Sequence, residues 1–215
     1  MNKKHTILIT RDMPPRVEAR ALSNYDARLN REDNIYNTDG LIAAAEGADG
    51  LLICGTEPMT PEVIARLPSS VRIIACFTAG YDHVDLAAAE ARGIVVTHAP
   101  DALTDAVADI TLLLLLGAAR RAGEGEAIMR GGGWDDIHLL FMTGAEIRGK
   151  RLGILGMGRI GRAVAHRARA FGMEIHYHNR SRLDAQLEDD AIWHEDAASL
   201  LQCADFLSLH CPSNE

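Results

Sequence analysis

Three glycines at a fixed spacing mark the segment of this sequence with the clearest chemical potential. The segment reads GMGRIG over residues 156–161, directly after the apolar run RLGIL and directly before RIGRAVAHRARAF. After a strand and before a helix, Gly156 allows a tight turn, Gly158 lets a pyrophosphate approach the backbone, and Gly161 lets the helix pack on the strand. The helix N-terminus at Arg159 and Ile160 then directs free N–H groups at the phosphates. We therefore expect a dinucleotide site here.

The residues after the next strand indicate which dinucleotide is bound. NAD-binding proteins usually place Asp or Glu at this point to bind the ribose 2′-hydroxyl. Here the position holds the neutral Asn179, followed by Arg180, Ser181 and Arg182. A carboxylate would repel a 2′-phosphate, whereas two guanidinium groups and a hydroxyl would bind one. The sequence therefore favours NADP, with NAD as the alternative and a solvated loop as the interpretation without a ligand.

The elements that position this loop alternate between apolar strands and helices. In the first half we expect strands at Thr6–Thr10, Gly50–Cys54, Val71–Phe77 and Gly93–Thr97. The expected helices run from Pro14 and Pro15 to about Leu29, then over Gly40–Gly47, Val63–Leu67 and Asp85–Ala91. Thr60 and Pro61 supply an N-cap and a first-turn proline for the third of these helices. Continuous apolar strands in β-α-β alternation predict a parallel sheet covered on both faces, an α/β fold.

The second half begins with a long apolar helix. It is expected over Ala102–Ala122 and contains five consecutive leucines, so we predict burial on nearly every side, at the joint between two domains. The strands that follow are expected at Arg151–Leu155, Glu174–His178 and Phe206–His210, with helices at Arg159–Phe171 and Glu195–Gln202. Three strands make one mononucleotide-binding half, so this dinucleotide domain is expected to be incomplete.

Composition narrows the class of protein. The net charge of −8 argues against nucleic acid as a partner, because phosphate backbones require a cationic face. The longest apolar run is too short to span a bilayer, and the N-terminus does not resemble a signal peptide, which favours a cytoplasmic protein without membrane contact. The four cysteines form no Cys-x-x-Cys pair. They are interpreted as small core residues in a reducing compartment, and no metal site is predicted.

Four ordered motifs together resemble the D-isomer-specific 2-hydroxyacid dehydrogenases. They are TAGYDHVD at 78–85, APDALTDAVAD at 99–109, LGILGMGRIGRAVAHRARAFGM at 152–173 and LHCP at 209–212. The stretch HNRSR at 178–182 makes the glyoxylate/hydroxypyruvate reductases the most similar group. The resemblance implies a flavodoxin-like substrate domain, here residues 1–99, and a Rossmann dinucleotide-binding domain, here residues 100–215. It also implies a homodimer, because family members usually pair through the cofactor domain and the long helix.

The resemblance assigns roles to residues outside the glycine loop. The N–H groups of Ala79 and Gly80 match those that hold the substrate carboxylate, and Thr56 is expected to face the same site. Thr104 matches a position near the nicotinamide, although by itself it is a good helix N-cap. Cys211 and Pro212 match backbone beside the adenosine.

The catalytic set of the family is an arginine, a histidine acid/base and a carboxylate that orients the histidine. The resemblance places all three after the last expected strand, and residues 1–215 contain no match for them. We interpret His83, His98, His176, His178 and His210 as structural or surface histidines, and Trp134 and Trp193 as packing or interface residues. The implied reaction is NAD(P)H-dependent reduction of a small 2-oxo acid to the D-2-hydroxy acid.

Several alternatives stay open. Within the family they are 2-ketogluconate reductase, phosphoglycerate dehydrogenase and formate or phosphite dehydrogenase, of which Asn179 disfavours the strictly NAD-dependent members. A second class is the non-catalytic scaffold that senses nucleotides, as in the family's transcriptional corepressors. A third is a regulatory or degenerate product of this length.

Overall fold

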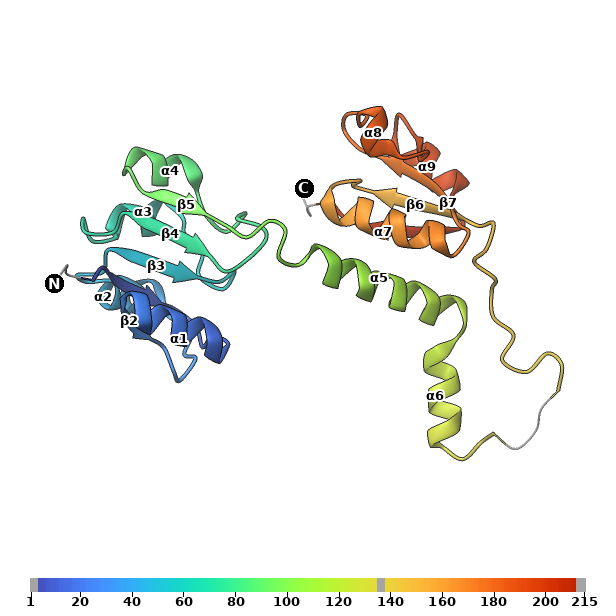
Figure 1. Cartoon of the computed structure of the whole chain (residues 1–215), viewed down its shortest axis with the longest axis horizontal. Helices are drawn as coiled ribbons and strands as arrows, with labels where there is room; N and C mark the ends of the chain where they lie inside the picture. The colour runs from blue at the N-terminus through green and yellow to red at the C-terminus, as the bar shows by residue number, and fades with distance from the viewer. Residues whose placement is uncertain (1–3, 135–137, 212–215) are drawn as a thin grey trace. The chain divides into compact units, whose positions relative to one another are not determined.

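The computed structural model describes residues 4–134 and 138–211 of the chain. It forms two compact units, Met1–Ala102 and Leu103–Glu215, whose elements are labelled in Figure 1. Each unit is built on its own sheet. Among the described residues, none of the helices has both the length and the apolar character needed to cross a membrane.

The first unit contains a parallel five-stranded sheet in its described part. Its strands are β1 (Thr6–Ile9), β2 (Asp26–Leu29), β3 (Gly50–Ile53), β4 (Ile73–Cys76) and β5 (Val95–Thr97). Their order is β2-β1-β3-β4-β5, and every pair is parallel. This is the flavodoxin-like strand order, in which the chain changes direction between β1 and β3. The flavodoxin-like prediction for the N-terminal part is confirmed.

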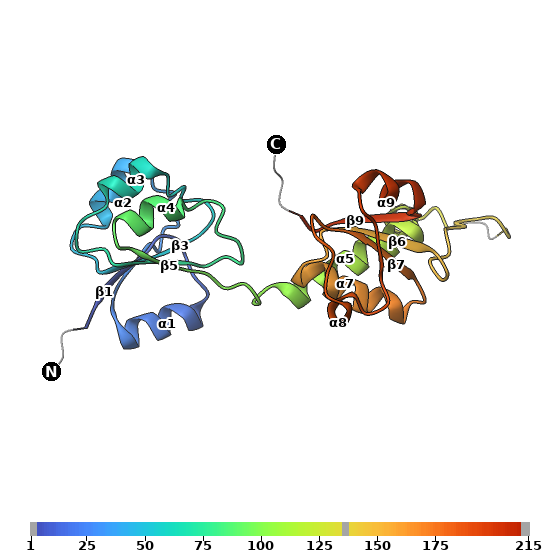
Figure 2. The ribbon, with the colours of Figure 1, turned by 90° about the horizontal axis from the view of Figure 1, so that it is seen from above.

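Helices cover both faces of this sheet. Helix α1 (Pro15–Asn24) lies on one face, and α2 (Thr38–Ala44), α3 (Pro61–Arg66) and α4 (Leu86–Ala91) lie on the other (Figure 2). The larger core lies under α2 to α4 and includes the fully buried Ile53, Ile64 and Ile74. Helix α3 begins as the sequence predicts, because the Thr60 hydroxyl accepts a hydrogen bond from the Val63 N–H.

The first helix is shorter than the sequence indicates. We expected it to continue to about Leu29, but α1 ends at Asn24 and Asp26–Leu29 forms the edge strand β2. Pairing with β1 stabilises this strand, and Ala27 and Leu29 pack on the small core beneath α1. A four-residue strand with alternating exposure carries a weak local signal, so tertiary pairing decided its conformation.

The second unit contains a parallel four-stranded sheet in its described part. Its strands are β6 (Arg151–Leu155), β7 (Glu174–His178), β8 (Ile192–Trp193) and β9 (Phe206–Leu209), in the order β8-β7-β6-β9. The sequence analysis missed β8, whose two residues pair with β7 at the sheet edge. This order corresponds to the 3-2-1-4 part of a dinucleotide-binding fold, so the Rossmann prediction is confirmed. The strand order reverses between β6 and β9, which is where such folds bind ligands.

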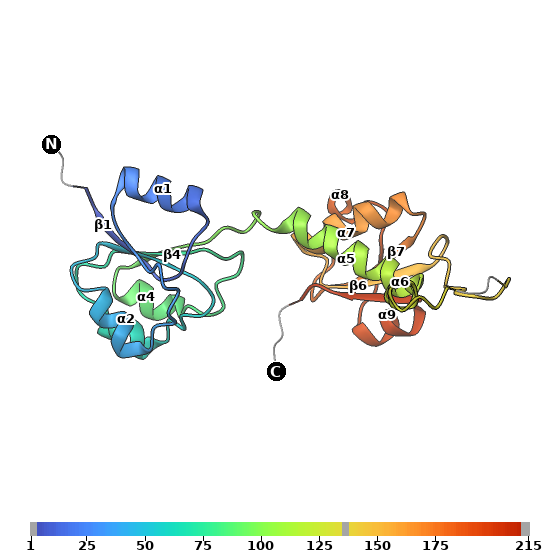
Figure 3. The ribbon, with the colours of Figure 1, turned by 90° about the horizontal axis from the view of Figure 1, so that it is seen from below.

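Helix α9 (Ala197–Cys203) covers one face of the second sheet and α7 (Arg159–Ala170) covers the other (Figure 3). The remaining helices are α5 (Thr104–Ala119), α6 (Ala122–Arg130) and α8 (Ala185–Glu188). Helix α5 packs against α7, where Arg167 forms ion pairs with Asp105 and Asp109.

The prediction that the leucine-rich helix is buried on nearly every side is wrong. Leu112 is 5% exposed, but Leu113 and Leu114 are 62% and 66% exposed. Within the described residues the helix packs mainly against α7, and it ends at Ala119, before the left-handed residue Arg121 at φ 55°. All of α5 lies in the second compact unit.

Candidate functional site

The glycine loop joins β6 to α7 at the carboxyl edge of the second sheet. Gly156 has φ +96°, and a Cβ atom there would lie 2.7 Å from the carbonyl carbon and oxygen of His210. A Cβ atom on Gly161 would lie 2.4 Å from the Gly156 oxygen. Both positions therefore require glycine, one for the turn and one for helix–strand packing. Around Gly158 nothing lies within 4 Å of such an atom, so this backbone is open to a ligand.

A pocket of about 550 Å³ lies over the carboxyl ends of β6, β7 and β9. Its lining includes six of the predicted cofactor residues: Gly156, Gly158, Asn179, Arg180, Ser181 and Cys211. The other lining residues are Leu155, Met157, His178, Leu183 and His210. The pocket lies at the point where the strand order reverses, which is the place where doubly wound sheets hold nucleotides. Its size and its open glycine backbone fit part of a dinucleotide.

Asn179 supports the glycine loop directly. Its Oδ1 atom accepts a hydrogen bond of 2.6 Å from the Met157 N–H. Because Oδ1 is occupied, the side-chain NH₂ group is the part of Asn179 left to contact a ligand, and this group only donates hydrogen bonds. A phosphate oxygen is an acceptor and fits this donor, whereas an Asp at this position would present a negative charge.

The two arginines after Asn179 have different surroundings. Arg180 is exposed, lines the pocket and has no hydrogen-bond or ion-pair partner within the described residues. Arg182 instead donates two hydrogen bonds to Glu188, from Nε to Oε1 at 2.8 Å and from Nη2 to Oε2 at 3.0 Å. Arg182 is absent from the pocket lining. The structure thus brings Arg180 and Ser181 to the pocket and holds Arg182 outside it.

Glu188 is the centre of a small polar cluster beneath this loop. It is 7% exposed, and its Oε1 also accepts a hydrogen bond of 2.6 Å from the Tyr177 hydroxyl. The hydrogen bonds from Arg182 and Tyr177 lower the pKa of Glu188 from 4.5 to about 2. Tyr177 in turn accepts a hydrogen bond of 3.1 Å from the Leu183 N–H. The cluster fixes the backbone between β7 and α8, and with it the place of Arg180 and Ser181.

The remaining predicted cofactor residues do not line the pocket or lie outside the described residues. Arg159 and Ile160 form the first turn of α7, directly after Gly158. Thr104 opens α5 but does not cap it, since the N-cap is Leu103. Its hydroxyl is buried and has no partner within the described part of the chain, which is unusual for a structural threonine. Pro212 lies outside the described residues.

In the first unit, Ala79 and Gly80 follow β4 in a tight loop. The Thr78 hydroxyl donates to the Gly80 carbonyl at 2.6 Å, and Nδ1 of His98 donates to the Ala79 carbonyl at 2.8 Å. Both carbonyl oxygens thus accept hydrogen bonds from side chains, while neither N–H group donates a hydrogen bond within the described residues. Two adjacent unpaired N–H groups are suited to a carboxylate.

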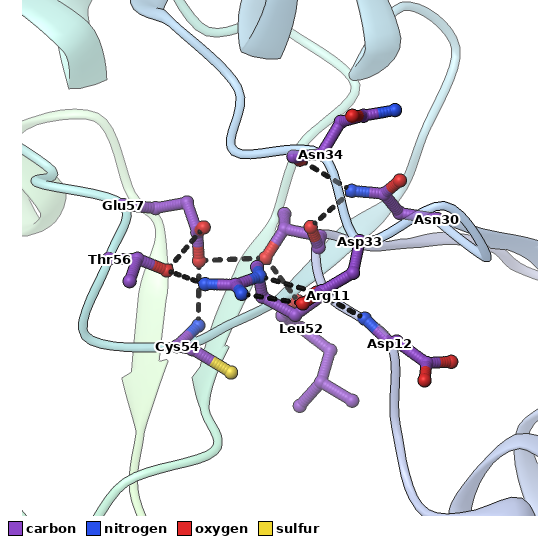
Figure 4. Close-up of polar contacts among 10 residues, drawn as sticks. Arg11, Asp12, Asn30, Asp33, Asn34, Leu52, Cys54, Thr56 and Glu57 are labelled. Carbon is purple, nitrogen blue, oxygen red and sulfur yellow. Dashed lines mark hydrogen bonds and ion pairs between the residues drawn. The ribbon is translucent and has the colours of Figure 1, made fainter.

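Thr56 belongs to a polar network at the carboxyl ends of β1 and β3 (Figure 4). Its hydroxyl accepts a hydrogen bond of 2.8 Å from Arg11 and donates one of 2.7 Å to Glu57. Arg11 also binds both carboxylate oxygens of Asp33, at 2.7 and 2.8 Å. These contacts lower the pKa of Asp33 to about 2. The Thr56 hydroxyl thus donates one hydrogen bond and accepts one, both within the protein.

Glu57 anchors this network from inside. It is 1% exposed, and its carboxylate accepts hydrogen bonds from the Thr10 hydroxyl at 2.8 Å, the Cys54 N–H at 2.8 Å and Thr56. The sequence analysis did not identify Arg11 or Glu57. Arg11 lies two residues after β1 and Glu57 four residues after β3, and the rule that polar residues at strand carboxyl ends gather at one edge would have suggested them.

Two histidines of the pocket were likewise interpreted only as structural. His178 hydrogen bonds through Nδ1 to the His194 carbonyl at 2.9 Å, and Nε2 of His210 lies 2.8 Å from the Ser208 hydroxyl. Burial lowers the pKa of His210 below its ordinary value, so this ring is neutral near pH 7. Both side chains border the pocket while making structural hydrogen bonds.

Comparison with known proteins gives concordant matches. The family model described as D-isomer specific 2-hydroxyacid dehydrogenase, NAD binding domain, matches residues 112–215. A glycerate dehydrogenase from Hyphomicrobium methylovorum is 42% identical over 99% of this chain and 66% of its own length.

Two solved structures are also similar. A glyoxylate reductase from Paecilomyes thermophila has a TM-score of 0.84 and 34% identity, covering 100% of this chain and 66% of that one. An NADPH-dependent glyoxylate/hydroxypyruvate reductase from Sinorhizobium meliloti, in complex with NADP and malonate, has a TM-score of 0.84 and 30% identity. That match covers 99% of this chain and 64% of the other.

The chain thus spans slightly less than two thirds of the length of these relatives. The likeness nevertheless runs over nearly all of its own residues and includes both sheets and the glycine loop. This chain belongs to the D-isomer-specific 2-hydroxyacid dehydrogenase family.

Proposed function

We propose that this protein is an NADPH-dependent reductase that converts a small 2-oxo acid, of the glyoxylate or hydroxypyruvate type, to the D-2-hydroxy acid. The second unit would bind the cofactor, and the first unit would bind the substrate carboxylate through the Ala79 and Gly80 N–H groups. The names of the relatives support this class, since hydroxypyruvate and D-glycerate are the oxidised and reduced forms of one acid.

The observation that carries the cofactor choice is the donor character of the pocket. Asn179 presents an NH₂ group, Arg180 has no partner among the residues that the structure describes, and Ser181 adds a hydroxyl. None of the lining residues carries a carboxylate. A 2′-phosphate would gain charge-assisted hydrogen bonds from this set, and a bare 2′-hydroxyl would gain less.

The chain's own residues would bind and orient the reactants. A bound nicotinamide supplies the hydride that reduces the 2-oxo group. The α7 N-terminus and the open Gly158 backbone would hold the pyrophosphate, and the unpaired N–H groups of Ala79 and Gly80 would hold the carboxylate. Fixing both reactants in this way lowers the entropic part of the barrier.

Fluorescence titration with NADPH and NADH tests the cofactor assignment. We expect tighter binding of NADPH, and we expect Arg180→Ala to weaken it about 10–100-fold while NADH binding changes little. Arg130→Ala, which removes an exposed arginine outside the pocket, is the matched control and should leave the binding of both cofactors unchanged. Equal or tighter binding of NADH would remove the NADP assignment.

Turnover tests the substrate class. In the full-length protein that carries this chain, glyoxylate and hydroxypyruvate should each support oxidation of NADPH, and acids without a 2-oxo group should not. Binding of neither dinucleotide would contradict the enzyme assignment and favour another role for the fold.

We further propose that the protein is a homodimer in a reducing, cytoplasmic environment. Leu113 and Leu114 leave an apolar face of α5 exposed, which suits a second copy of the chain. All four cysteines are free thiols, as expected where disulfides do not form.

A further inference from the structure

Three potential metal ligands meet on the α9 side of the second sheet. His176 lies in β7, His194 follows β8, and Cys203 ends α9. Their ligand atoms all lie within 4.8 Å of one another. His176 Nδ1 is 2.9 Å from His194 Nε2, and the Cys203 sulfur is 3.5 Å from each of these nitrogens.

The outer nitrogen of each ring has a partner that can accept a hydrogen bond. Nε2 of His176 lies 2.9 Å from a carboxylate oxygen of Glu174, which can only accept, so this nitrogen carries the proton. Nδ1 of His194 lies 3.3 Å from the Ser199 hydroxyl, which already donates to the Asp196 carbonyl at 2.9 Å. The Ser199 oxygen is thus able to accept a hydrogen bond from Nδ1 of His194.

When both outer nitrogens carry the ring protons, the two inner nitrogens carry none. Nδ1 of His176 and Nε2 of His194 then present lone pairs to each other across 2.9 Å, with the sulfur beside them. Two facing lone pairs repel unless a proton or a cation lies between them. Metal-binding histidines typically donate their outer N–H to a carboxylate or another acceptor, and both rings have such an acceptor here.

The distances also suit a tetrahedral ion. Zinc–nitrogen bonds of about 2.0–2.1 Å and a zinc–sulfur bond of about 2.3 Å place tetrahedral ligand atoms about 3.3–3.6 Å apart. The two nitrogen–sulfur separations of 3.5 Å match this range. The nitrogen–nitrogen separation of 2.9 Å would widen by a few tenths of an ångström, which small ring rotations allow.

We propose that His176, His194 and Cys203 bind one divalent transition-metal ion, with zinc as the best match. Two imidazoles and a thiolate select such an ion over magnesium or calcium, which prefer oxygen ligands. Water would complete the coordination, since His194 and Cys203 are only partly buried. The Cys203 thiol, which donates to the Leu200 carbonyl at 3.2 Å, would release its proton to solvent as the metal–sulfur bond forms. The ion would join β7, the segment after β8, and α9.

No pattern in the sequence indicates this site. His176 and His194 are 18 residues apart, and Cys203 is 9 residues beyond His194, so the short spacings of zinc motifs are absent. The strand pairing of β7 with β8 and the packing of α9 on β7 bring the three together.

Cobalt provides the direct test. After removal of metals with a chelator, the protein is titrated with Co²⁺ and then with Zn²⁺. We expect one equivalent of Co²⁺ to produce a thiolate-to-metal charge-transfer band and intense visible bands of tetrahedral cobalt, and Zn²⁺ to abolish them. Cys203→Ser should lose the charge-transfer band, whereas Cys54→Ser, a matched change at another partly buried thiol, should retain it. Glu174→Gln should weaken binding about 10–100-fold, because it removes the charge that orients His176.

A second measurement needs no substitution. Zinc should slow alkylation of Cys203, read by mass spectrometry of its peptide, and leave alkylation of Cys54 unchanged. Absence of the cobalt bands in the unsubstituted protein would overturn the proposal, as would equal alkylation of Cys203 with and without zinc. An unchanged spectrum in Cys203→Ser would equally exclude the sulfur as a ligand.

Discussion

Arg182 forms a two-pronged ion pair with Glu188 rather than reaching the nucleotide pocket. The two hydrogen bonds measure 2.8 and 3.0 Å, and Glu188 has the Tyr177 hydroxyl as a further donor. Arg182, which the sequence suggests as a phosphate ligand, thus stabilises the loop instead. Only Arg180 of the two lines the pocket.

This relationship predicts a specific acid sensitivity. The pKa of Glu188 falls from 4.5 to about 2 on folding, so its stabilising contribution is full above pH 4.5 and is lost as the pH falls toward 2. Arg182→Ala should lower the thermal midpoint at pH 7 by a few degrees and flatten its dependence on pH between 4.5 and 2. Melting curves across this range check it. A variant with the unsubstituted pH profile would show that Arg182 does not set the pKa of Glu188.

The glycine loop offers a matched pair of substitutions. Gly156→Ala should destabilise the second unit and abolish dinucleotide binding, because the new methyl group meets the His210 backbone at 2.7 Å in a left-handed conformation. Gly158→Ala should leave the thermal midpoint unchanged, since its surroundings are open, but weaken cofactor binding at least about 10-fold by blocking the pyrophosphate. Calorimetry and fluorescence titration separate the two effects. Equal melting of both variants would contradict this distinction.

Glu57 should matter for stability more than any other residue of the network around Thr56. Glu57→Ala would leave the buried Thr10 hydroxyl and the Cys54 N–H without their carboxylate partner. We expect a loss of about 1–3 kcal/mol in the free energy of unfolding, because the Cys54 N–H loses its acceptor while the Thr10 hydroxyl keeps the Leu52 carbonyl at 3.2 Å. Urea denaturation measures it. Thr56→Ala, at the rim of the same network, should cost less, and the reverse order would show that the buried carboxylate is not the anchor.

The exposed face of α5 gives a prediction about assembly. Leu114→Glu places a charge on a side chain that is 66% exposed in the isolated chain, so the fold of the second unit should be unaffected. If a second copy covers this face, the variant should be monomeric where the unsubstituted protein is dimeric. Light scattering coupled to gel filtration measures the mass. Identical masses for both proteins would place any dimer contact elsewhere.

The sequence predicted the fold where the signals are local. Buried apolar strands, the capped helix α3 and the glycine loop each depend on neighbouring residues, and all were found close to their expected positions. The strands β2 and β8 were missed because they are short edge strands, whose conformation depends on pairing with β1 and β7.

The sequence does not predict which side chains contact each other, for a related reason. The contact of Asn179 with Met157 and the pair of Arg182 with Glu188 join different elements, as does the approach of Cys203 to His176. The sequence identified residues that could bind phosphate, but only the folded backbone decides which of them face a ligand and which face one another.

Asn179 provides the sharpest test of cofactor choice. Asn179→Asp keeps an oxygen that can accept the Met157 N–H hydrogen bond, so the glycine loop should keep its shape. The substitution replaces the donating NH₂ group with a negative charge, which repels a 2′-phosphate and accepts from a 2′-hydroxyl. We expect the ratio of NADPH to NADH affinity to fall about 10–100-fold, with an unchanged melting temperature. Parallel titrations with both cofactors measure the ratio, and Asn179→Ser, which introduces no charge, is the control. If the aspartate and serine variants show the same ratio, residue 179 does not discriminate between a 2′-phosphate and a 2′-hydroxyl. Arg180 and Ser181 would then remain as the residues that do.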